Sequence, residues 1–306
     1  MSDAKVTVVG SFAVGLTLRA DRFPVKGETL IGRDFDQGPG GKGSNQAVQV
    51  ARLGGDVEFV ALIGEDAFGD VAVKLYAQEK VGTTYLIRTK ERNTGVGFIV
   101  LNSEGDNFII LDPGANALFS PAHVDKAVNR IRKSSVVITQ LEIPAATAAH
   151  AMKMGKQAGA TTILNPAPAA PFPPDAFSSV DIATPNHTEL RVLLGRRPDD
   201  PTDSKDLCSE LLKAGVGTVI LTRGEEGVMI VRGDGAKEIP AMAVKVVDTT
   251  GAGDAFSGTL AAWLAEGMEL EDAAKRAAAA GALACTKLGV IPALPYAKDV
   301  EALLKG

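Results

Sequence analysis

Cysteine, histidine and aromatic residues are scarce in this sequence. Its 306 residues include two cysteines, three histidines and one tryptophan. Two isolated cysteines, Cys208 and Cys285, indicate a reducing compartment rather than a disulfide framework, so we expect a cytoplasmic protein. The histidines His123, His150 and His187 lack metal-ligand spacing, which argues against a zinc site.

Long apolar runs and clusters of basic residues are also missing. No uninterrupted apolar stretch approaches the ~18 residues that a membrane helix needs. The short apolar stretch after Lys5 has no A-x-A cleavage site, so it fits a buried first strand better than a signal peptide. The net charge of −5 and the lack of a basic run argue against a nucleic-acid partner. We therefore expect neither a membrane nor a nucleic acid as a partner.

What the sequence does contain is a regular alternation of apolar, strand-like runs with amphipathic, helix-like stretches. Strands are predicted at 6–10, 57–64, 135–139, 161–165, 181–185 and 218–222. Helices are predicted at 43–54, 68–80, 145–158, 188–194, 203–214, 255–267 and 270–289. Such alternation is typical of an α/β fold, in which a central, mostly parallel sheet is flanked by crossover helices. We expect one domain over residues 1–306.

Two segments interrupt this alternation. Residues 16–36 have an extended character, and residues 94–114 contain two strand-like runs around a polar turn. We interpret both as antiparallel pieces of a small β lid, formed by about 11–37 and 94–114, over the C-terminal edge of the central sheet. Open α/β sheets bind ligands at that edge. Because lid strands have free edges that can pair with another subunit, a homodimer through the lid is a further hypothesis.

The strongest chemical signal is the segment 246–258, VVDTTGAGDAFSG. Gly251 and Gly253 let the backbone approach a ligand closely. The unpaired amides of the helix that follows form an anion site together with the helix dipole. A carboxylate at the same place, Asp254, is useful if a hydroxyl must lose its proton while it attacks a phosphoryl group. The alternative is that Asp254 only caps the helix.

The segment 37–54, QGPGGKGSNQAVQVARLG, carries the second signal. Its glycines 38, 40, 41 and 43 predict a turn crowded with small residues before a helix. Lys42 donates as a point charge and Asn45 both donates and accepts, which suits the recognition of a polyhydroxyl compound. The alternative is a glycine turn with Lys42 in solvent. A Walker A loop is absent, and the N-terminal stretch VTVVGSFAVG (6–15) is not a G-x-G-x-x-G fingerprint, which disfavours a Rossmann dehydrogenase.

These two motifs resemble the signatures of the ribokinase-like, or PfkB, carbohydrate kinases, and of their ribokinase branch above all. GGKGSNQA (40–47) and DTTGAGDAFSG (248–258) occur in the expected order. The likeness also includes GSF (10–12), PVKGET (24–29), QLEIP (140–144), NPAPA (165–169), TPNHTE (184–189) and LTRGEEG (221–227), and thus spans essentially the whole chain. The resemblance implies a ribokinase-like fold and a kinase that uses ATP and Mg²⁺ to phosphorylate a hydroxyl, expected to be a primary one, of a small sugar.

The resemblance also implies roles for individual residues. Asp254 would be the general base that takes the proton from the sugar hydroxyl. The backbone of Gly251, Ala252 and Gly253 would stabilise charge on the transferring phosphoryl group. The sugar would be held by Gly41, Lys42, Asn45 and Glu142 together with Asp254.

The resemblance places the nucleotide and its ions as well. ATP would be lined by Asn186, Thr222, Arg223, Gly224, Glu225, Glu226, Gly227 and Gly253, and Glu189 would hold Mg²⁺ through water. A monovalent cation, expected to be K⁺, would lie beside Asp248, Thr250, Ala284, Lys287, Gly289 and Ala293. Considered without the family, Asn186 and Glu189 form only a helix capping box, and Glu142 is only a surface charge.

One departure from the family bears on the substrate. In the ribokinase branch an Asn and an Asp after the first strand hold the ribose hydroxyls, and here Ala13 and Gly15 stand at those positions. A site without the hydrogen-bonding partner cannot select for the hydroxyl. Ribose is therefore doubtful, and we expect an acceptor that lacks a hydroxyl there or is bulkier. The remaining alternatives are a kinase for a nucleoside or another small alcohol, and a non-catalytic sugar-binding regulator.

Overall fold

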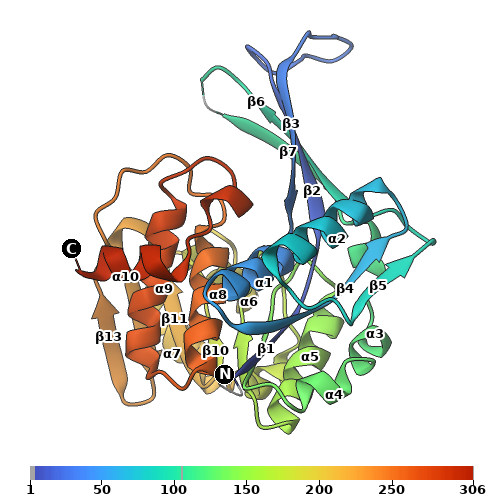
Figure 1. Cartoon of the computed structure of the whole chain (residues 1–306). Helices are drawn as coiled ribbons and strands as arrows, with labels where there is room; N and C mark the ends of the chain where they lie inside the picture. The colour runs from blue at the N-terminus through green and yellow to red at the C-terminus, as the bar shows by residue number, and fades with distance from the viewer. Residues whose placement is uncertain (1–3, 105, 306) are drawn as a thin grey trace.

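The structure, a computed structural model, describes residues 4–104 and 106–305, and the strands within this part of the chain form a sheet of nine and a sheet of four. The larger, central sheet has the order β13-β12-β11-β10-β9-β8-β1-β4-β5 (Figure 1). Its strands are β1 (Lys5–Val9), β4 (Asp56–Gly64), β5 (Leu86–Thr89), β8 (Val136–Thr139), β9 (Thr161–Leu164), β10 (Ile182–Ala183), β11 (Thr218–Thr222), β12 (Val228–Arg232) and β13 (Gly235–Ile239). From β11 to β5 the neighbouring strands pair in parallel, and β12 and β13 add an antiparallel end.

Helices cover both faces of the central sheet. One face packs against α1 (Lys42–Arg52), α2 (Ala67–Glu79), α8 (Ala252–Ala265), α9 (Leu270–Ala284) and α10 (Ala297–Lys305). The other packs against α3 (Pro121–Asp125), α4 (Val128–Ile131), α5 (Ala145–Gln157), α6 (His187–Leu193) and α7 (Ser204–Lys213). Alternate residues of a strand point to opposite faces, so Val8 joins the first core and Val9 the second. Burial on both faces explains why the parallel strands are nearly continuous apolar runs.

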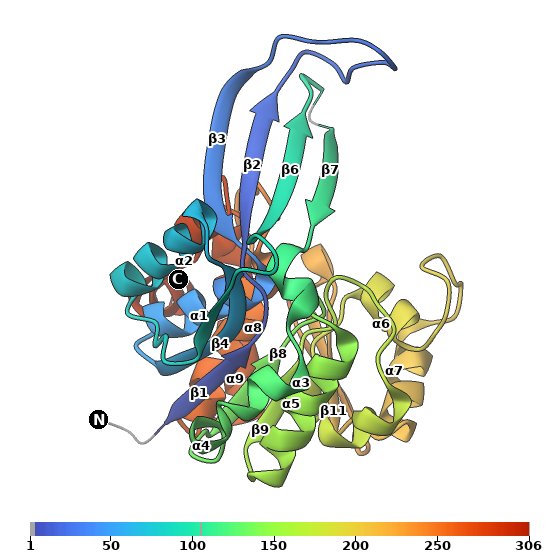
Figure 2. The same ribbon diagram turned by 90° about the vertical axis from the view of Figure 1, so that its right-hand side faces the viewer.

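The second sheet stands out from the body (Figure 2). Its order is β3-β2-β6-β7, with β2 (Ala13–Arg19), β3 (Arg33–Gly40), β6 (Gly95–Leu101) and β7 (Asn107–Asp112). These strands lie in the two segments expected to form the lid, except that β3 continues past residue 37 to Gly40. The pairs β2–β3 and β6–β7 are antiparallel, but β2 pairs with β6 in parallel, which the sequence analysis did not anticipate. Strands β2 and β6 both run outward from the body (Figure 2). Ala13 pairs with Gly95 at their start and Arg19 with Leu101 at their end.

Two predicted boundaries were wrong. The helix expected over 270–289 ends at Ala284, because the Cys285 carbonyl accepts hydrogen bonds from the backbone of Val247 and Asp248 instead of continuing the helix. The residues that follow form a loop with a short 3₁₀ turn at Ile291–Ala293. The expected turn at glycines 38–43 is narrower, since β3 extends to Gly40 and α1 begins at Lys42.

Across residues 4–104 and 106–305, no helix combines the length and the apolar character needed to cross a bilayer.

Candidate active site

The predicted site residues gather where the parallel strands of the central sheet end. The chain after β1 leads through residues 10–12 to β2, and β8 is followed by Gln140 and Glu142. The segments that follow β9, β10 and β11 begin at residues 165, 184 and 223. Because parallel strands present their carboxyl ends at one edge, these segments share that edge with the N-termini of α1 and α8.

The N-terminus of α8 is open. Gly251, with φ 82°, precedes the helix, and its added Cβ would lie 2.6 Å from Cγ1 of Val290. At Gly253 an added Cβ would meet nothing within 4 Å. The Ala255 amide donates to the carbonyl of Gly251 at 2.8 Å. The amides of Gly253 and Asp254 come before it in the first turn, so they have no carbonyl acceptor within the helix. The helix therefore offers free backbone donors beside an unfilled space, as the glycine-rich motif predicts.

The N-terminus of α1 is held against the chain that leaves β1. Gly41 has φ 88°, and a Cβ there would lie 2.8 Å from Cα of Phe12. At Gly43 a Cβ would lie 2.5 Å from the backbone nitrogen of Ser11. One carboxylate oxygen of Glu142 accepts from the Ser11 hydroxyl at 2.6 Å and from the Lys42 amide at 2.8 Å. Glu142 is therefore not only a surface charge, because it fixes the start of the helix.

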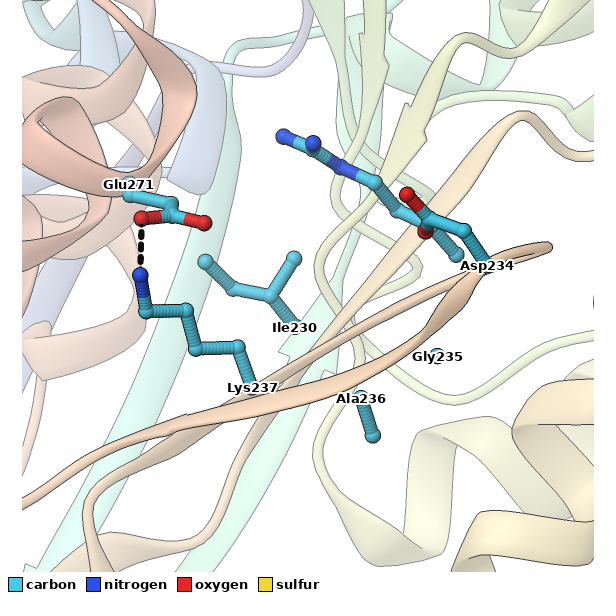
Figure 3. A pocket seen from close by; sticks show the side chains of 7 residues that line it. Ile230, Asp234, Gly235, Ala236, Lys237 and Glu271 are labelled. Atoms are coloured by element: carbon cyan, nitrogen blue, oxygen red, sulfur yellow. Dashed lines mark hydrogen bonds and ion pairs between the residues drawn. The ribbon is translucent and has the colours of Figure 1, made fainter.

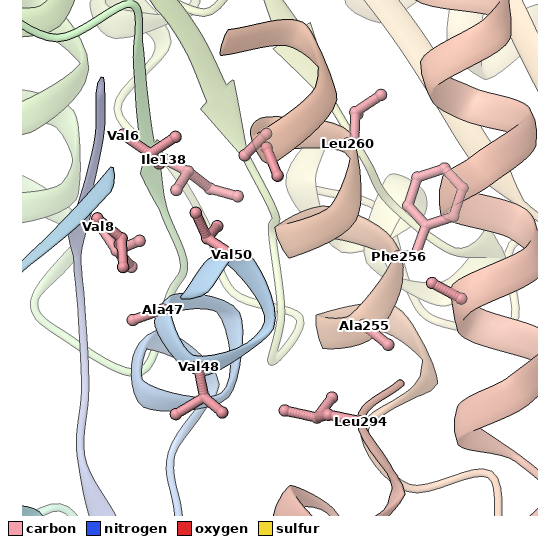
Figure 4. Packing of buried hydrophobic residues seen from close by; sticks show 14 of the residues in the cluster. Val6, Val8, Ala47, Val48, Val50, Ile138, Ala255, Phe256, Leu260 and Leu294 are labelled. Atoms are coloured by element: carbon pink, nitrogen blue, oxygen red, sulfur yellow. The ribbon is translucent and has the colours of Figure 1, made fainter. Parts of the chain in front are cut away.

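Close packing of α1 on α8 brings the two motifs together. A Cβ at Gly258 would lie 2.8 Å from Cβ of Gln49 and 2.9 Å from the carbonyl oxygen of Gln46, so only glycine fits. Figure 4 shows Ala47, Val48 and Val50 of α1 beside Ala255 and Leu260 of α8. Because the helices are this close, Asn45 and Gln46 of α1 reach the carboxylate of Asp254 on α8.

Asp254 is 4% exposed and receives a hydrogen bond on each carboxylate oxygen. Asn45 donates from Nδ2 to Oδ2 at 2.8 Å, and Gln46 donates from Nε2 to Oδ1 at 3.2 Å. These bonds span more than 200 positions of sequence. The N-cap residue of α8 is Gly251, and no side chain caps this helix, so Asp254 does not have the capping role that was the alternative.

Charges of both signs surround Asp254. Burial raises the pKa of Asp254, an effect that Lys42 and the Asn45 amide oppose and that Glu142 reinforces. Burial alone would lower the pKa of Lys42, but the charges of Asp254, Glu142 and Glu189 outweigh it and raise that pKa. Lys42 is partly buried, and its charge interacts with those of three carboxylates, which disfavours the alternative of a lysine in solvent.

The N-x-x-E motif lies at the start of α6. Asn186 accepts from the Glu189 amide at 2.8 Å, and the Glu189 carboxylate accepts from the Asn186 amide at 2.9 Å. This is the capping box considered as an alternative. Burial, with a smaller contribution from Asp254, raises the pKa of Glu189, whereas the Asn186 amide and Lys42 lower it. The Glu189 carboxylate therefore caps α6 and also interacts electrostatically with Lys42 and Asp254.

The segment 222–227 lies beside this motif. Thr222 pairs with Asn186 as an isolated parallel bridge, and its amide donates to the carbonyl of Pro185 at 2.9 Å. Gly224 and Gly227 both have positive φ, 58° and 83°. The guanidinium of Arg223 is directed to Glu226 and Glu238, so this side chain faces the β12–β13 side rather than open space.

Of the residues expected to hold a monovalent cation, Thr250 and Gly289 contact Asp248. One oxygen of Asp248 accepts from the amide and hydroxyl of Thr250, and the other accepts from the Gly289 amide at 3.2 Å. Ala284 and Ala293 are buried, whereas the Lys287 side chain is exposed. Among residues 4–104 and 106–305, no cluster of three or more His, Cys, Asp or Glu could hold a metal ion.

A hollow on the surface lies elsewhere. It is lined by Arg232, Asp234 and Lys237 of the β12–β13 hairpin and by Glu271 of α9 (Figure 3). Lys237 pairs with Glu271 across it. The hollow shares none of the predicted site residues.

Sequence reasoning missed several residues that contact the site. Ser11 binds Glu142, Gln46 binds Asp254, and Asn165 binds Gln46. Each follows or begins an element at the ligand edge of the sheet. Polar residues directly after buried apolar strands, as in NPAPA (165–169), were the signal that could have found Asn165.

Comparison with known proteins decides the family. The pattern of the pfkB family of carbohydrate kinases matches residues 3–297. The chain belongs to this family. This pfkB-family protein is 37% identical to a ribokinase of Mus musculus, over 98% of the chain and 95% of the relative. It is 34% identical to a deoxyribokinase of Salmonella typhi, over 95% of each.

Solved structures agree. The kinase is similar to a ribokinase of Thermotoga maritima, at 35% identity and a TM-score of 0.91, covering 98% of this chain and 99% of that one. It is also similar to the Arabidopsis thaliana ribokinase complexed with ribose and ATP, at 32% identity and a TM-score of 0.93, covering 100% of both chains. The predicted ribokinase-like α/β fold and carbohydrate kinase activity are thereby confirmed, and the regulator alternative loses its support.

Proposed function

We propose that the protein transfers the γ-phosphoryl group of ATP to a primary hydroxyl of a small sugar, with Asp254 as the general base. The observation that carries this is a buried carboxylate at an open helix N-terminus. Both of its oxygens are fixed by amide donors. A base held in this way can accept the hydroxyl proton while the backbone of Gly251, Ala252 and Gly253 stabilises charge on the phosphoryl oxygens. In this structure the Ala252 amide donates to the Thr249 carbonyl at 3.3 Å, so it would exchange that bond for one to the phosphoryl group.

The sugar is held by the start of α1 and by Glu142. Oδ1 of Asn45 is buried and, among the residues that the structure describes, has no hydrogen-bond partner. A buried acceptor without a partner is costly, so a ligand hydroxyl that donates to it fits this position. Lys42 donates to sugar oxygens from the same helix, and Gly41 contributes its backbone beside them.

The nucleotide lies along the segments 186–189 and 222–227, which are adjacent. Asn186, Thr222, Gly224, Glu225, Glu226 and Gly227 line it, with Gly253 at the phosphate end. Arg223 contributes its backbone, since its side chain binds glutamates. Glu189 fits Mg²⁺, because that ion keeps several waters and needs only one or two carboxylates. When bound, Mg²⁺ neutralises charge on the β- and γ-phosphate oxygens.

The acceptor is a sugar other than ribose. Val14 is buried in the core that contains Tyr76 of α2, so Ala13 and Gly15 lie on the opposite face of the second sheet. Their partners on β3 are Gly40 and Gly38. This part of the sheet carries no polar side chain, and a Cβ at Gly15 would meet its nearest atom at 3.7 Å. It suits an acceptor that lacks a hydroxyl here, or a bulkier one, and a deoxyribokinase is among the relatives.

Three finer features belong to the same proposal. The second sheet acts as a lid over the sugar and joins two subunits, because its edge strand β7 exposes an apolar run at Phe108–Leu111. K⁺ lies beside Asp248, Thr250 and Gly289, with carbonyls of Ala284, Lys287 and Ala293. The protein is cytoplasmic, which two free cysteines support.

Asp254→Asn tests the central claim. The amide is isosteric but is not a base, so kcat should fall by about 10²–10⁴ while sugar binding and the melting temperature are retained. Kinase assays, calorimetric titration with sugar and thermal melts measure these three properties. Asp125→Asn is the matched control, because Asp125 is an exposed carboxylate that binds only His150 at 2.7 Å in this structure. If Asp254→Asn turned over normally, Asp254 would not be the base.

A further inference from the structure

Three buried amide side chains form a connected group behind Asp254. They are Gln46 on α1, Gln140 after β8 and Asn165 after β9. Gln46 donates from Nε2 both to Oδ1 of Asp254 at 3.2 Å and to Oδ1 of Asn165 at 3.0 Å. Its Oε1 accepts from Nε2 of Gln140. Both N–H donors of the Gln46 amide are therefore in use, one to Asp254 and one to Asn165.

The direction of these hydrogen bonds is fixed by a backbone carbonyl. Asn165 donates from Nδ2 to the carbonyl oxygen of Thr184 at 3.2 Å, and a carbonyl can only accept. Oδ1 of Asn165 must then face Gln46 as an acceptor, which requires the Gln46 nitrogen at that position. The same nitrogen meets Asp254. The Gln140 amide agrees with this orientation, because its nitrogen donates to the Gln46 oxygen.

We propose that Gln46, oriented by Gln140 and Asn165, is a positioning residue that holds Asp254 as an ionised, correctly directed base. The inference rests on the proposed function, in which Asp254 takes the hydroxyl proton. Gln46 donates to one carboxylate oxygen of Asp254 and Asn45 to the other, so the carboxylate is held in a single orientation. Gln46 acts through Asp254 and does not contact the sugar.

A neutral donor has a distinct effect on the base. The charged groups that face Asp254 are Lys42, which favours its ionised form, and Glu142 and Glu189, which oppose it. A hydrogen bond from Gln46 stabilises the carboxylate without adding charge. Its loss therefore raises the pKa of Asp254 beyond the rise that burial already causes. Because the base must be ionised, the acidic limb of the rate profile then moves to higher pH.

Gln46→Met tests this, since methionine has a similar volume and donates no hydrogen bond. On the acidic limb, kcat should fall by about tenfold, the effect expected when a hydrogen bond to a charged group is lost. The deficit should shrink as pH rises, and KM for the sugar should be unchanged. Gln49→Met is the matched control. Gln49 is equally buried on the same helix, but it donates to Thr259 Oγ1 and to the Pro295 carbonyl.

The two variants separate positioning from folding. Gln46→Met loses three buried hydrogen bonds and Gln49→Met loses two, so both should lower the melting temperature, but only Gln46→Met should move the acidic limb. Gln140→Met removes the bond that orients Gln46, and it should move the limb in the same direction by less. If both Gln46→Met and Gln140→Met kept the wild-type pH profile, the inference would be wrong even with Asp254→Asn inactive. An active Asp254→Asn would instead overturn the proposed function.

Discussion

Asp254 shows how one residue obtains its chemistry from distant parts of the chain. Its own helix supplies the position, but its charge state is set by burial and by Lys42, Asn45 and Gln46 of α1. The sequence motif DTTGAGDAFSG predicts the carboxylate and an anion site, because both are local properties of a helix start. It did not identify Gln46, since the bond to Asp254 joins residues 208 positions apart.

Ala13 and Gly15 carry the prediction about specificity. Replacing both, as Ala13→Asn with Gly15→Asp, should raise kcat/KM for ribose by roughly thirtyfold, because two hydrogen bonds to hydroxyls each contribute about 1 kcal/mol. The structure admits the larger residue at 15, where the nearest atoms to an added Cβ are 3.7 and 3.8 Å away. ADP release from a panel of pentoses, deoxysugars, hexoses and nucleosides measures the preference.

The wild-type enzyme provides the decisive comparison for that panel. A deoxysugar or a bulkier sugar should have the highest kcat/KM. Ribose as the best acceptor of the wild type would contradict the hypothesis, whatever the double variant does. Val25→Ala is a suitable control, because this exposed residue lies between β2 and β3.

Among the elements, the pair α1 and α8 determines the geometry of the site. Both helices begin at the ligand edge, and they touch where Gly258 faces Gln46 and Gln49. The sequence predicted each helix separately from its apolar periodicity. The distance between the two helices could not be predicted. It depends on the missing side chain of Gly258, and the sequence does not show that this residue faces α1.

Gly258→Ala should therefore push the two helices apart. The added methyl would sit 2.8 Å from Cβ of Gln49, so the free energy of unfolding should fall by about 1–3 kcal/mol. Activity should fall with it, because Asn45 and Gln46 would withdraw from Asp254. Denaturant titration and kinase assays measure both effects.

Gly253→Ala is the control for this prediction. A Cβ at Gly253 meets nothing within 4 Å, so stability should be retained. Its activity is expected to fall for another reason, since residue 253 lies at the proposed phosphate position. Equal stability of Gly258→Ala and the wild type would show that the helix contact tolerates a methyl group.

At the scale of the whole molecule, the second sheet is the feature that packing within one chain leaves unexplained. Along β7 the four residues Phe108–Leu111 are each more than half exposed, and Phe98 of β6 is exposed as well. An apolar edge strand of this kind is an aggregation hazard unless another chain covers it. A second copy of the protein is the partner that we propose.

Ile110→Glu should give a monomer, because a charge at the centre of the covered surface would be desolvated without a partner. Sedimentation velocity or light scattering reports the mass, which should halve. Val73→Glu is the control, since Val73 is an exposed apolar residue on α2, outside the second sheet. A wild-type protein that is monomeric at the concentrations used for assay would contradict the proposed dimer.

The sequence by itself determined the alternating α/β architecture, the two glycine-rich helix starts and the carboxylate, Asp254, that we propose as the base. These follow from periodicity, from backbone conformations open to glycine and from the chemistry of single side chains, all of which are local. Only the tertiary structure decided the parallel pairing of β2 with β6, the end of α9 at Ala284 and the amide group behind Asp254. Those features depend on which distant segments meet, and a buried donor or a missing side chain has meaning only once its neighbour is in place.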